Sequence, residues 1–447
     1  MNSFSKPEYP EFKPFLALIF FGYICAFFLQ IGSRIDIFRT VRLEFSLALV
    51  LLIVAFTYNS RIKYPPSKIA GLIGVYLFFV VIQIPLSMDV SYSYDMFVDR
   101  FLKFSVMAIF IAKFVDNPKM VLVFLAGYLL SCFKMGEEGF VGNITGSMVW
   151  QNQGVMRLHG STRMYAHPNS FAGMALGTMP FIYYLYPLYG KHIKIFLLIM
   201  LVFAINIVIF SASRTGYVGF FMLAMFVFWH SQYKNRFILI TILAAIPAIM
   251  FMPEQYVGRF SSIFTGKEAE GRSTEARLTI IQNALAVFAK HPLGVGVAAF
   301  PVARERYYGL RQDTHNLYLE VATNLGIQGL IVFLLLFWAV AKGYSRLRSK
   351  LHLQIEAMQS LPDPPEGEAR TELQQHKKNL KLYLAVCCAV YMYLMLRLVL
   401  GIFGHDLYEI YWWIVLGFLF SLQKLNFIAE KITANYQQMS NGEIATL

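Results

Sequence analysis

The chain has 447 residues, 57% of them hydrophobic and 15% charged, and a formal net charge of +13. A soluble domain keeps a polar face on most of its helices and strands. Many segments here have no such face, and the runs 14–31 and 197–213 contain no charged residue. Each run is close to the roughly 20 residues that a helix needs to cross a bilayer. The composition therefore excludes a soluble fold, and the absence of alternating segments excludes a membrane barrel.

The apolar runs predict an all-α polytopic membrane protein with about 12 transmembrane helices. In chain order, the predicted spans are 14–32, 42–58, 67–87, 97–115, 118–135, 168–187, 193–212, 214–230, 236–252, 318–342, 380–404 and 408–423. The first run is too long for a cleavable signal peptide, and no small-residue cleavage site follows it, so we expect it to stay as an anchor.

The distribution of positive charge predicts which side each loop faces. Lys and Arg gather in the breaks 61–68, 191–194, 234–236 and 342–350, whereas the alternate break 89–95 is acidic. The positive-inside rule therefore places both termini in the cytoplasm. Arg34, Arg39 and Arg42 run against this rule. No basic stripe with interleaved aromatic residues is present, so we expect no nucleic-acid partner.

Four regions lie between or after the spans of this single membrane domain. We expect outward-facing loops over 136–167 and 253–317, a cytoplasmic loop over 344–379 and a cytoplasmic, loosely ordered tail over 424–447. Within the longest loop, residues 273–289 are predicted to form a helix, with Ser273 as its cap and Glu275 in its first turn. The loop around Pro362 mixes both charges and reads as a solvated linker or as short helices.

Polar and mostly cationic residues gather at the outer membrane level. Arg214, His315 and Asn316 begin predicted helices there, as do Arg163, His167 and Asn169, and the long loop adds Arg259, Lys267, Arg272, Arg277, Lys290, Arg304, Arg306 and Arg311. Cations that run against the orientation rule indicate binding of an anionic substrate. Because arginine binds phosphate in a bidentate manner, a diphosphate is the expected ligand.

Each of these residues also has a structural interpretation when it is taken alone. Arg214 could extend to lipid headgroups, and a single histidine such as His315 is more often a cap or a solvated residue than a base. Asn169 could simply begin its helix. Arg397 lies deep inside an apolar span, which makes it a functional candidate, with structural pairing to Asp406 or Asp99 as the alternative.

The order of several short motifs resembles a known family. Ala276-Arg277 is followed by His291-Pro-Leu-Gly-Val-Gly296, then by Thr314-His315-Asn316 and by Leu325-Gly-Ile-Gln-Gly-Leu330. This order closely resembles the signature of the O-antigen ligase and polymerase superfamily. Two further elements match it, namely Arg163 with Pro168-Asn169, and Ser213-Arg214-Thr-Gly216.

The resemblance implies a glycosyltransferase of the bacterial inner membrane whose active site faces the periplasm. The donor would be a glycan on undecaprenyl diphosphate, the acceptor a lipid A core oligosaccharide, and the surroundings membrane lipids. By the same resemblance, His315 would be the general base, and Arg214 and Arg277 would stabilise the diphosphate. Arg163, His167, Asn169, Arg272, Asn316 and Arg397 would belong to the substrate site. No cofactor is expected, and the outward loops offer no Asp-x-Asp pair for a metal.

Two other functions remain open. A polymerase of the same superfamily would use the same donor and a second lipid-linked glycan as its acceptor. The length of the chain and its one dominant outward loop favour the ligase. A polytopic transporter or flippase would also suit 12 spans, but its binding groups would lie near the bilayer midplane. Gly294 and Gly296 would allow the long loop to hinge as a lid.

Overall fold

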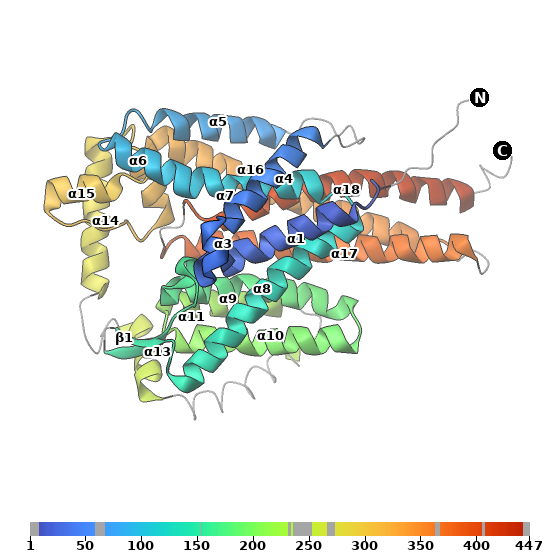
Figure 1. The fold of residues 1–447 in the computed structure, drawn as a ribbon, viewed down its shortest axis with the longest axis horizontal. Coiled ribbons are helices and arrows are strands. Elements are labelled where there is room, and N and C mark those ends of the chain that lie inside the picture. The colour runs from blue at the N-terminus through green and yellow to red at the C-terminus, as the bar shows by residue number, and fades with distance from the viewer. Residues whose placement is uncertain are drawn as a thin grey trace.

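The computed structural model describes residues 9–58, 68–152, 154–230, 234–235, 253–265, 273–362, 367–404 and 407–440. Its described part is a bundle of helices, most of which run along the long axis of the molecule (Figure 1). The protein is therefore an all-α polytopic membrane protein. One short antiparallel hairpin, β1 (Val149–Asn152) and β2 (Val155–Leu158), lies among the described residues and was not predicted.

The first part of the chain forms the helices that precede the hairpin. They are α1 (Pro14–Leu29), α2 (Ile31–Arg34), α3 (Asp36–Thr40), α4 (Leu43–Thr57), α5 (Lys68–Ile82), α6 (Val90–Met96), the π-helix η1 (Phe97–Leu102), α7 (Lys103–Phe114) and α8 (Pro118–Thr145). Asn117 caps α8 by accepting a hydrogen bond from the Met120 amide at 3.0 Å, and Pro118 fits the first turn because it needs no amide partner there.

The second part contains the longest helices. After the 3-10 turn η2 (Arg163–Tyr165) come α9 (Pro168–Leu185), the turn η3 (Tyr186–Leu188), α10 (Lys191–Phe210), α11 (Arg214–His230), α13 (Glu254–Thr265), α14 (Ser273–Lys290), α15 (Phe300–Tyr308), α16 (Leu317–Ser360), α17 (Glu368–Leu400) and α18 (Ile410–Ser440). The predicted helix at 273–289 is confirmed by α14, which ends one residue later than expected.

Length and hydropathy identify the helices that can cross a membrane. Among the described residues, five are long and apolar enough, namely Pro118–Thr145, Lys191–Phe210, Leu317–Ser360, Glu368–Leu400 and Ile410–Met439. Shorter apolar helices are Pro14–Leu29, Leu43–Thr57, Lys68–Ile82 and Arg214–Trp229. The count of 12 spans stays a prediction, and the span at 236–252 lies outside the described residues.

Two of the expected polar regions are largely helical instead. The connection expected at 344–379 consists largely of helix, because α16 continues to Ser360 and α17 begins at Glu368, and its cytoplasmic location stays a prediction. The predicted loose tail at 424–447 is likewise helical as far as Ser440 in α18. These extensions pack against one another and bury Leu351 and Leu373, and the Gln354 side chain donates to Asn426 Oδ1 at 2.8 Å. The extensions lie at the end of the bundle away from α14 (Figure 1).

A break in α16 fixes the connection between the outer helices. Gly326 has φ 73° and ψ −176°, so the regular hydrogen bonding of α16 stops there. The segment 291–297 fills the break, because the amides of Val295 and Gly296 donate to the carbonyls of Thr323 and Asn324 at 2.9 and 3.1 Å. The backbone polar groups that the break exposes are thereby satisfied.

The glycines of this segment serve close packing. Gly294 and Gly296 have φ of 101° and 115°, a region that favours glycine. A Cβ at Gly294 would come within 2.7 Å of the Asn324 carbonyl oxygen. A small apolar cluster of α14, α15 and this segment, which includes Ile280, Val287 and Phe300, holds the outer helices in place. The segment is therefore a packed junction, which leaves little room for the hinge that its glycines would permit.

Candidate functional site

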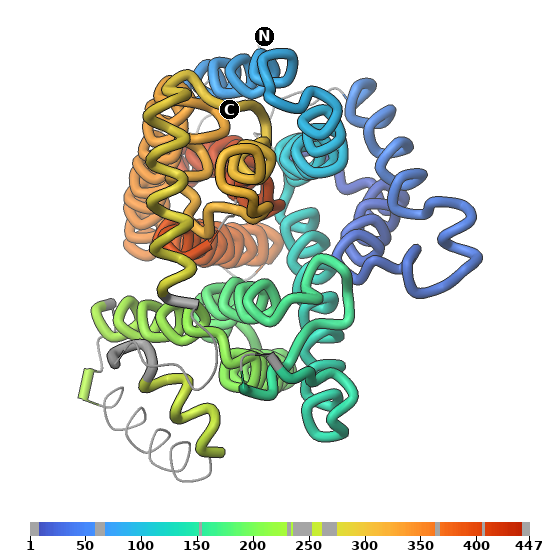
Figure 2. Tube along the Cα trace, turned by 90° about the vertical axis from the view of Figure 1, so that its left-hand side faces the viewer, coloured from blue at the N-terminus to red at the C-terminus, as the bar shows by residue number. Residues whose placement is uncertain are grey.

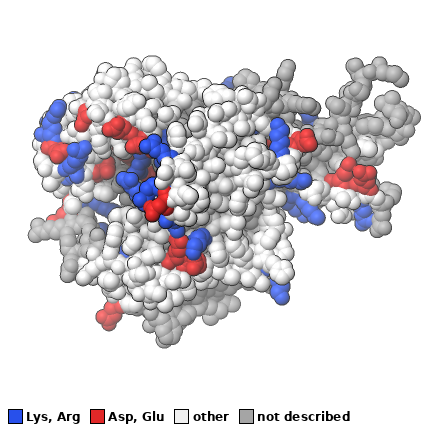
Figure 3. Space-filling view, in the orientation of Figure 1, with Lys and Arg blue, Asp and Glu red and all other residues white. Residues whose placement is uncertain are grey.

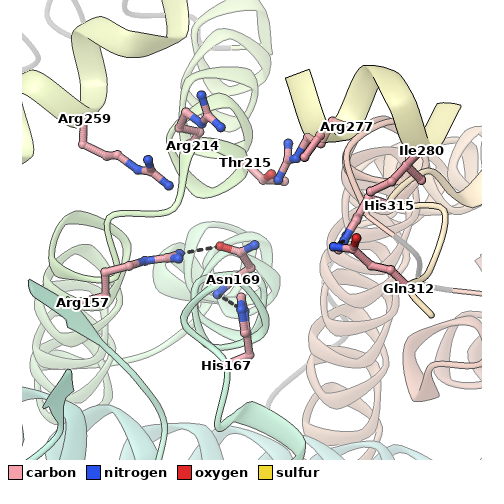
Figure 4. A pocket seen from close by; sticks show the side chains of 11 residues that line it. Arg157, His167, Asn169, Arg214, Thr215, Arg259, Arg277, Ile280, Gln312 and His315 are labelled. Atoms are coloured by element: carbon pink, nitrogen blue, oxygen red, sulfur yellow. Dashed lines mark hydrogen bonds between the residues drawn. The ribbon is translucent and has the colours of Figure 1, made fainter. Parts of the chain in front are cut away.

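A cavity of about 260 Å³ lies at the end of the molecule that carries α13 and α14. Figure 2 looks at this end and shows α14 crossing in front of the bundle, from α15 towards α11 and α13. The cavity is lined by Arg157, His167, Asn169, Arg214, Thr215, Arg259, Ala276, Arg277, Ile280, Gln312 and His315 (Figure 4). Four of these residues are arginines and two are histidines, and no Asp or Glu is among the described lining residues.

The turn between α10 and α11 organises one side of the cavity. Ser213 accepts a hydrogen bond from the Gly216 amide at 3.0 Å through its hydroxyl, and so caps α11. Arg214 is consequently the first residue of α11 and lies at the positive end of that helix. Helix N-termini of this kind favour anions, because their amides have no partners within the helix.

Arg157 projects from β2 to the same turn. Its side chain is only 4% exposed, its Nε donates to the Ser211 carbonyl at 2.9 Å, and its Nη2 donates to Asn169 Oδ1 at 2.7 Å. Burial, followed by the charges of Arg259, Arg214 and Arg277, lowers the pKa of Arg157 to about 10. Arg157 is thus a buried cation among other cations, which costs electrostatic free energy. A bound anion would remove this cost.

Arg259, from α13, also contacts the turn. Its Nε donates to the Ala212 carbonyl at 3.4 Å, and Ala212 itself is in the left-handed region with φ 48°. Two consecutive carbonyls of the turn, from Ser211 and Ala212, thus accept from two arginines of different elements. Backbone strain of this kind is common where a structure positions functional groups.

His315 forms the opposite side of the cavity. It has φ 51° and lies directly before Asn316, the residue that caps α16. The Asn316 side chain is used structurally, because its Oδ1 accepts from the Leu319 amide at 3.0 Å and its Nδ2 donates to the Ile402 carbonyl at 3.0 Å. His315 Nε2 lies 3.3 Å from Gln312 Nε2 (Figure 4).

The cavity brings together five of the residues that the sequence singled out for the site. These are His315, Arg214, Arg277, His167 and Asn169. His167 and Asn169 lie at the start of α9, where His167 Nδ1 accepts from the Asn169 amide at 3.2 Å. Asn316 is adjacent to the cavity as a helix cap, and Arg272 lies outside the described residues.

Arg163 does not line the cavity. Its side chain is exposed in η2, and its backbone amide donates to Gln30 Oε1 at 2.8 Å. Arg34, one of the residues that runs against the positive-inside rule, pairs with Glu138 at 2.6 Å. Arginines that the sequence placed on the outer side therefore also have structural partners.

Arg397 is likewise absent from the described lining. It is 7% exposed in α17, its Nη2 donates to the Gly173 carbonyl of α9 at 2.7 Å, and its guanidinium lies 3.9 Å from the ring centroid of Tyr411. It also lies 5.1 Å from the ring of Tyr393. These contacts tie α9 to α17 and α18 beside the cavity, so any role in substrate binding would be indirect.

Arg157 and Gln312 line the cavity but were not selected from the sequence. Arg157 depends on the hairpin, whose only signal is a glycine, Gly154, between two short runs that contain valine. Gln312 depends on the fold of the loop before α16 and carries no local signal. Arg259 was one of several loop arginines that spacing alone could not rank.

Comparison with known proteins finds one similarity, in the middle of the chain. Residues 199–334 match the family model described as O-antigen ligase. The match runs from α10 into α16 and includes Arg214, Arg277 and His315, whereas Arg157, His167 and Asn169 precede it. No curated protein matches the chain. Over residues 199–334, the chain is therefore similar to O-antigen ligases.

Proposed function

We propose that this protein is an O-antigen ligase of the bacterial inner membrane. It transfers a glycan from undecaprenyl diphosphate to the lipid A core oligosaccharide. The observation that carries this proposal is the cavity, in which four arginines and His315 line one space without a described carboxylate. The similarity of residues 199–334 to O-antigen ligases supports the reaction class, and Arg214, Arg259, Arg277 and His315 lie within the matched region.

The arginine side of the cavity suits the diphosphate of the donor. Arg157, Arg214, Arg259 and Arg277 come from four different elements and converge on one space (Figure 4). Arginine forms paired hydrogen bonds to phosphate oxygens, and the N-terminus of α11 adds a positive dipole. Negative charge builds up on the diphosphate as its bond to the sugar breaks, so cations fixed in advance stabilise the transition state.

His315 suits the role of general base. The acceptor hydroxyl oxygen bonds to the anomeric carbon while the bond from that carbon to the diphosphate oxygen breaks. The hydroxyl proton passes to His315, and undecaprenyl diphosphate leaves with its negative charge held by the arginines. A neutral imidazole can accept this proton near neutral pH. Direct displacement inverts the anomeric centre.

The arrangement of charge supports a cavity that faces the periplasm. Figure 3 shows Lys, Arg, Asp and Glu gathered towards two ends of the molecule, with a region of other residues between them. The cavity lies at one end, and the extensions of α16, α17 and α18 lie at the other (Figure 1). Lys342, Arg346, Arg348 and Lys350 belong to those extensions, which the positive-inside rule assigns to the cytoplasm.

A transfer assay tests the proposal. Purified protein is mixed with an undecaprenyl-diphosphate glycan and lipid A core in the presence of a chelator. We expect glycosylated lipid A core from the native protein, and none from His315→Ala. The control is His352→Ala, an exposed histidine on the distal part of α16, which should keep full activity.

Other products would overturn the proposal in distinct ways. Longer glycan that remains on undecaprenyl diphosphate would identify a polymerase. Failure to transfer to either acceptor, with donor still bound, would favour a transporter.

A further inference from the structure

A buried arginine behind the cavity controls the orientation of a side chain that contacts His315. Arg304 on α15 is 2% exposed and does not line the cavity. Its Nη1 donates to Gln312 Oε1 at 3.1 Å, and Gln312 Nε2 lies 3.3 Å from His315 Nε2. Neither Arg304 nor Gln312 has a role in the reaction described above.

The chemistry of these groups determines the direction of each hydrogen bond. A guanidinium only donates, so the amide oxygen of Gln312 must face Arg304. The amide nitrogen of Gln312 then faces His315, and an amide NH₂ also only donates. Nε2 of His315 must therefore accept, which means that it carries a lone pair and that the proton of the neutral ring lies on Nδ1.

Arg304 is itself held in place. In the orientation that satisfies both ends of its amide, Asn283 of α14 accepts from Arg304 Nε at 3.2 Å and donates to the Thr279 carbonyl at 3.3 Å. Burial lowers the pKa of Arg304, but an arginine stays charged at neutral pH. The side-chain oxygens of Asn283 and Gln312 thus both accept from Arg304, which always remains a donor.

We propose that Gln312, oriented by Arg304, is a positioning residue that keeps Nε2 of His315 unprotonated and directed to the acceptor. This inference rests on the proposed role of His315 as the base. Gln312 is exposed at the rim of the cavity, and its contact to His315 is long for a hydrogen bond. The acceptor hydroxyl can therefore replace the Gln312 amide at Nε2 and deliver its proton to the same lone pair.

Both cationic and acidic residues lie near His315. A group in direct contact with the ring is therefore needed to set its protonation state. Positive or titratable groups that face the cavity with it are Arg157 of β2, His167 before α9, Arg214 of α11, Arg259 of α13 and Arg277 of α14. Asp313 lies two residues before His315, and Glu320 lies in the first turn of α16. The Gln312 amide contacts Nε2 itself, which lets it select the neutral tautomer directly.

Gln312→Glu is the decisive variant. A carboxylate at this position accepts a hydrogen bond and so favours a protonated Nε2, while Arg304 still holds its other oxygen. We expect the acidic limb of the kcat/KM profile to move up by about one pH unit, which lowers transfer at pH 7 about threefold. Gln312→Ala should lower kcat/KM a few-fold, without the upward movement. The matched control is Gln282→Glu on the exposed face of α14, which should leave the profile unchanged.

A second measurement does not depend on transfer. Diethyl pyrocarbonate acylates neutral imidazole, and peptide mass spectrometry follows its reaction with His315 as a function of pH. In Gln312→Glu the modification curve should move to higher pH, and Arg304→Lys should give an intermediate result because lysine cannot contact both amides. Coincident curves for the native protein and Gln312→Glu would overturn the inference. Full transfer by His315→Ala is a separate result, which would contradict the proposed function and the role of His315 as the base.

Discussion

Arg157 shows how a single side chain couples the hairpin to the rest of the cavity. Its two hydrogen bonds, to the Ser211 carbonyl and to Asn169, require the forked geometry of a guanidinium. Lysine would keep the charge but could not make both contacts and also reach a phosphate. Substitution at position 157 therefore tests whether donor binding needs the shape of the guanidinium as well as its charge.

We expect Arg157→Lys to lower kcat/KM for the lipid-linked donor by about 10- to 100-fold. This range corresponds to the loss of one charge-assisted hydrogen bond, worth roughly 1.5 to 3 kcal/mol. Steady-state kinetics with varied donor would measure it. Arg306→Lys, on the exposed side of α15, is the control and should behave as the native protein does. An equal loss in both variants would show that Arg157 has no special place in donor binding.

The sequence predicted those site residues that begin helices. Arg214, His167, Asn169 and His315 all lie at or next to helix starts, and the order of apolar spans places these starts at one membrane level. Arg157 could not be predicted in this way, because its position depends on a hairpin and on carbonyls that a turn exposes. Arg397 was selected for its depth, yet its described contacts are a backbone carbonyl and aromatic rings.

At the scale of elements, the junction between segment 291–297 and the break of α16 positions His315. The first turns of α16, which follow His315, are held by hydrogen bonds to this segment rather than by a continuous helix. Apolar patterning predicted the span but not the break. The predicted span ended at 342, whereas α16 continues to Ser360, close to the proline-rich stretch near Pro362.

Gly294→Ala tests the junction. Alanine at φ 101° is strained, and its Cβ would approach the Asn324 carbonyl oxygen at 2.7 Å. We expect a loss of about 1 to 3 kcal/mol in the free energy of unfolding, together with a lower kcat as α16 shifts. Thermal unfolding in detergent and the transfer assay measure these effects.

The control for this variant is Gly190→Ala. Gly190 has φ −76° at the start of α10, and a Cβ there would have no neighbour within 4 Å. Its stability should match that of the native protein. Unchanged stability in Gly294→Ala would instead mean that the junction can rearrange at little cost.

At the scale of the whole molecule, the cavity gathers four arginines and no described carboxylate at one end of an apolar bundle. Burial of Arg157, followed by repulsion from Arg259, Arg214 and Arg277, lowers its pKa, and both effects destabilise the folded state until an anion binds. Ligands that bind only the folded state raise its stability in proportion to the logarithm of their concentration. The unliganded protein is thus expected to respond to small anions.

Inorganic pyrophosphate should raise the unfolding temperature at low ionic strength, by about 1 °C for each kcal/mol of stabilisation in a chain of this length. Salt should reduce the effect, because the Debye length falls to roughly 3 Å at 1 M. Differential scanning fluorimetry across a pyrophosphate titration measures the shift. The double variant Arg214→Ala, Arg277→Ala should lose it, and an undiminished shift in that variant would place the anion elsewhere.

The turn at 211–214 limits how homologues of this chain can diverge. Four consecutive residues supply a carbonyl to Arg157, a carbonyl to Arg259, the cap of α11 and Arg214 itself. Because the first two contributions come from the backbone, the side chains at 211 and 212 can change, and glycine or asparagine would suit the left-handed position at 212. An insertion or deletion, however, would misplace all four groups at once. In an alignment of homologues that keep the site, this stretch should vary in residue type but contain no gaps.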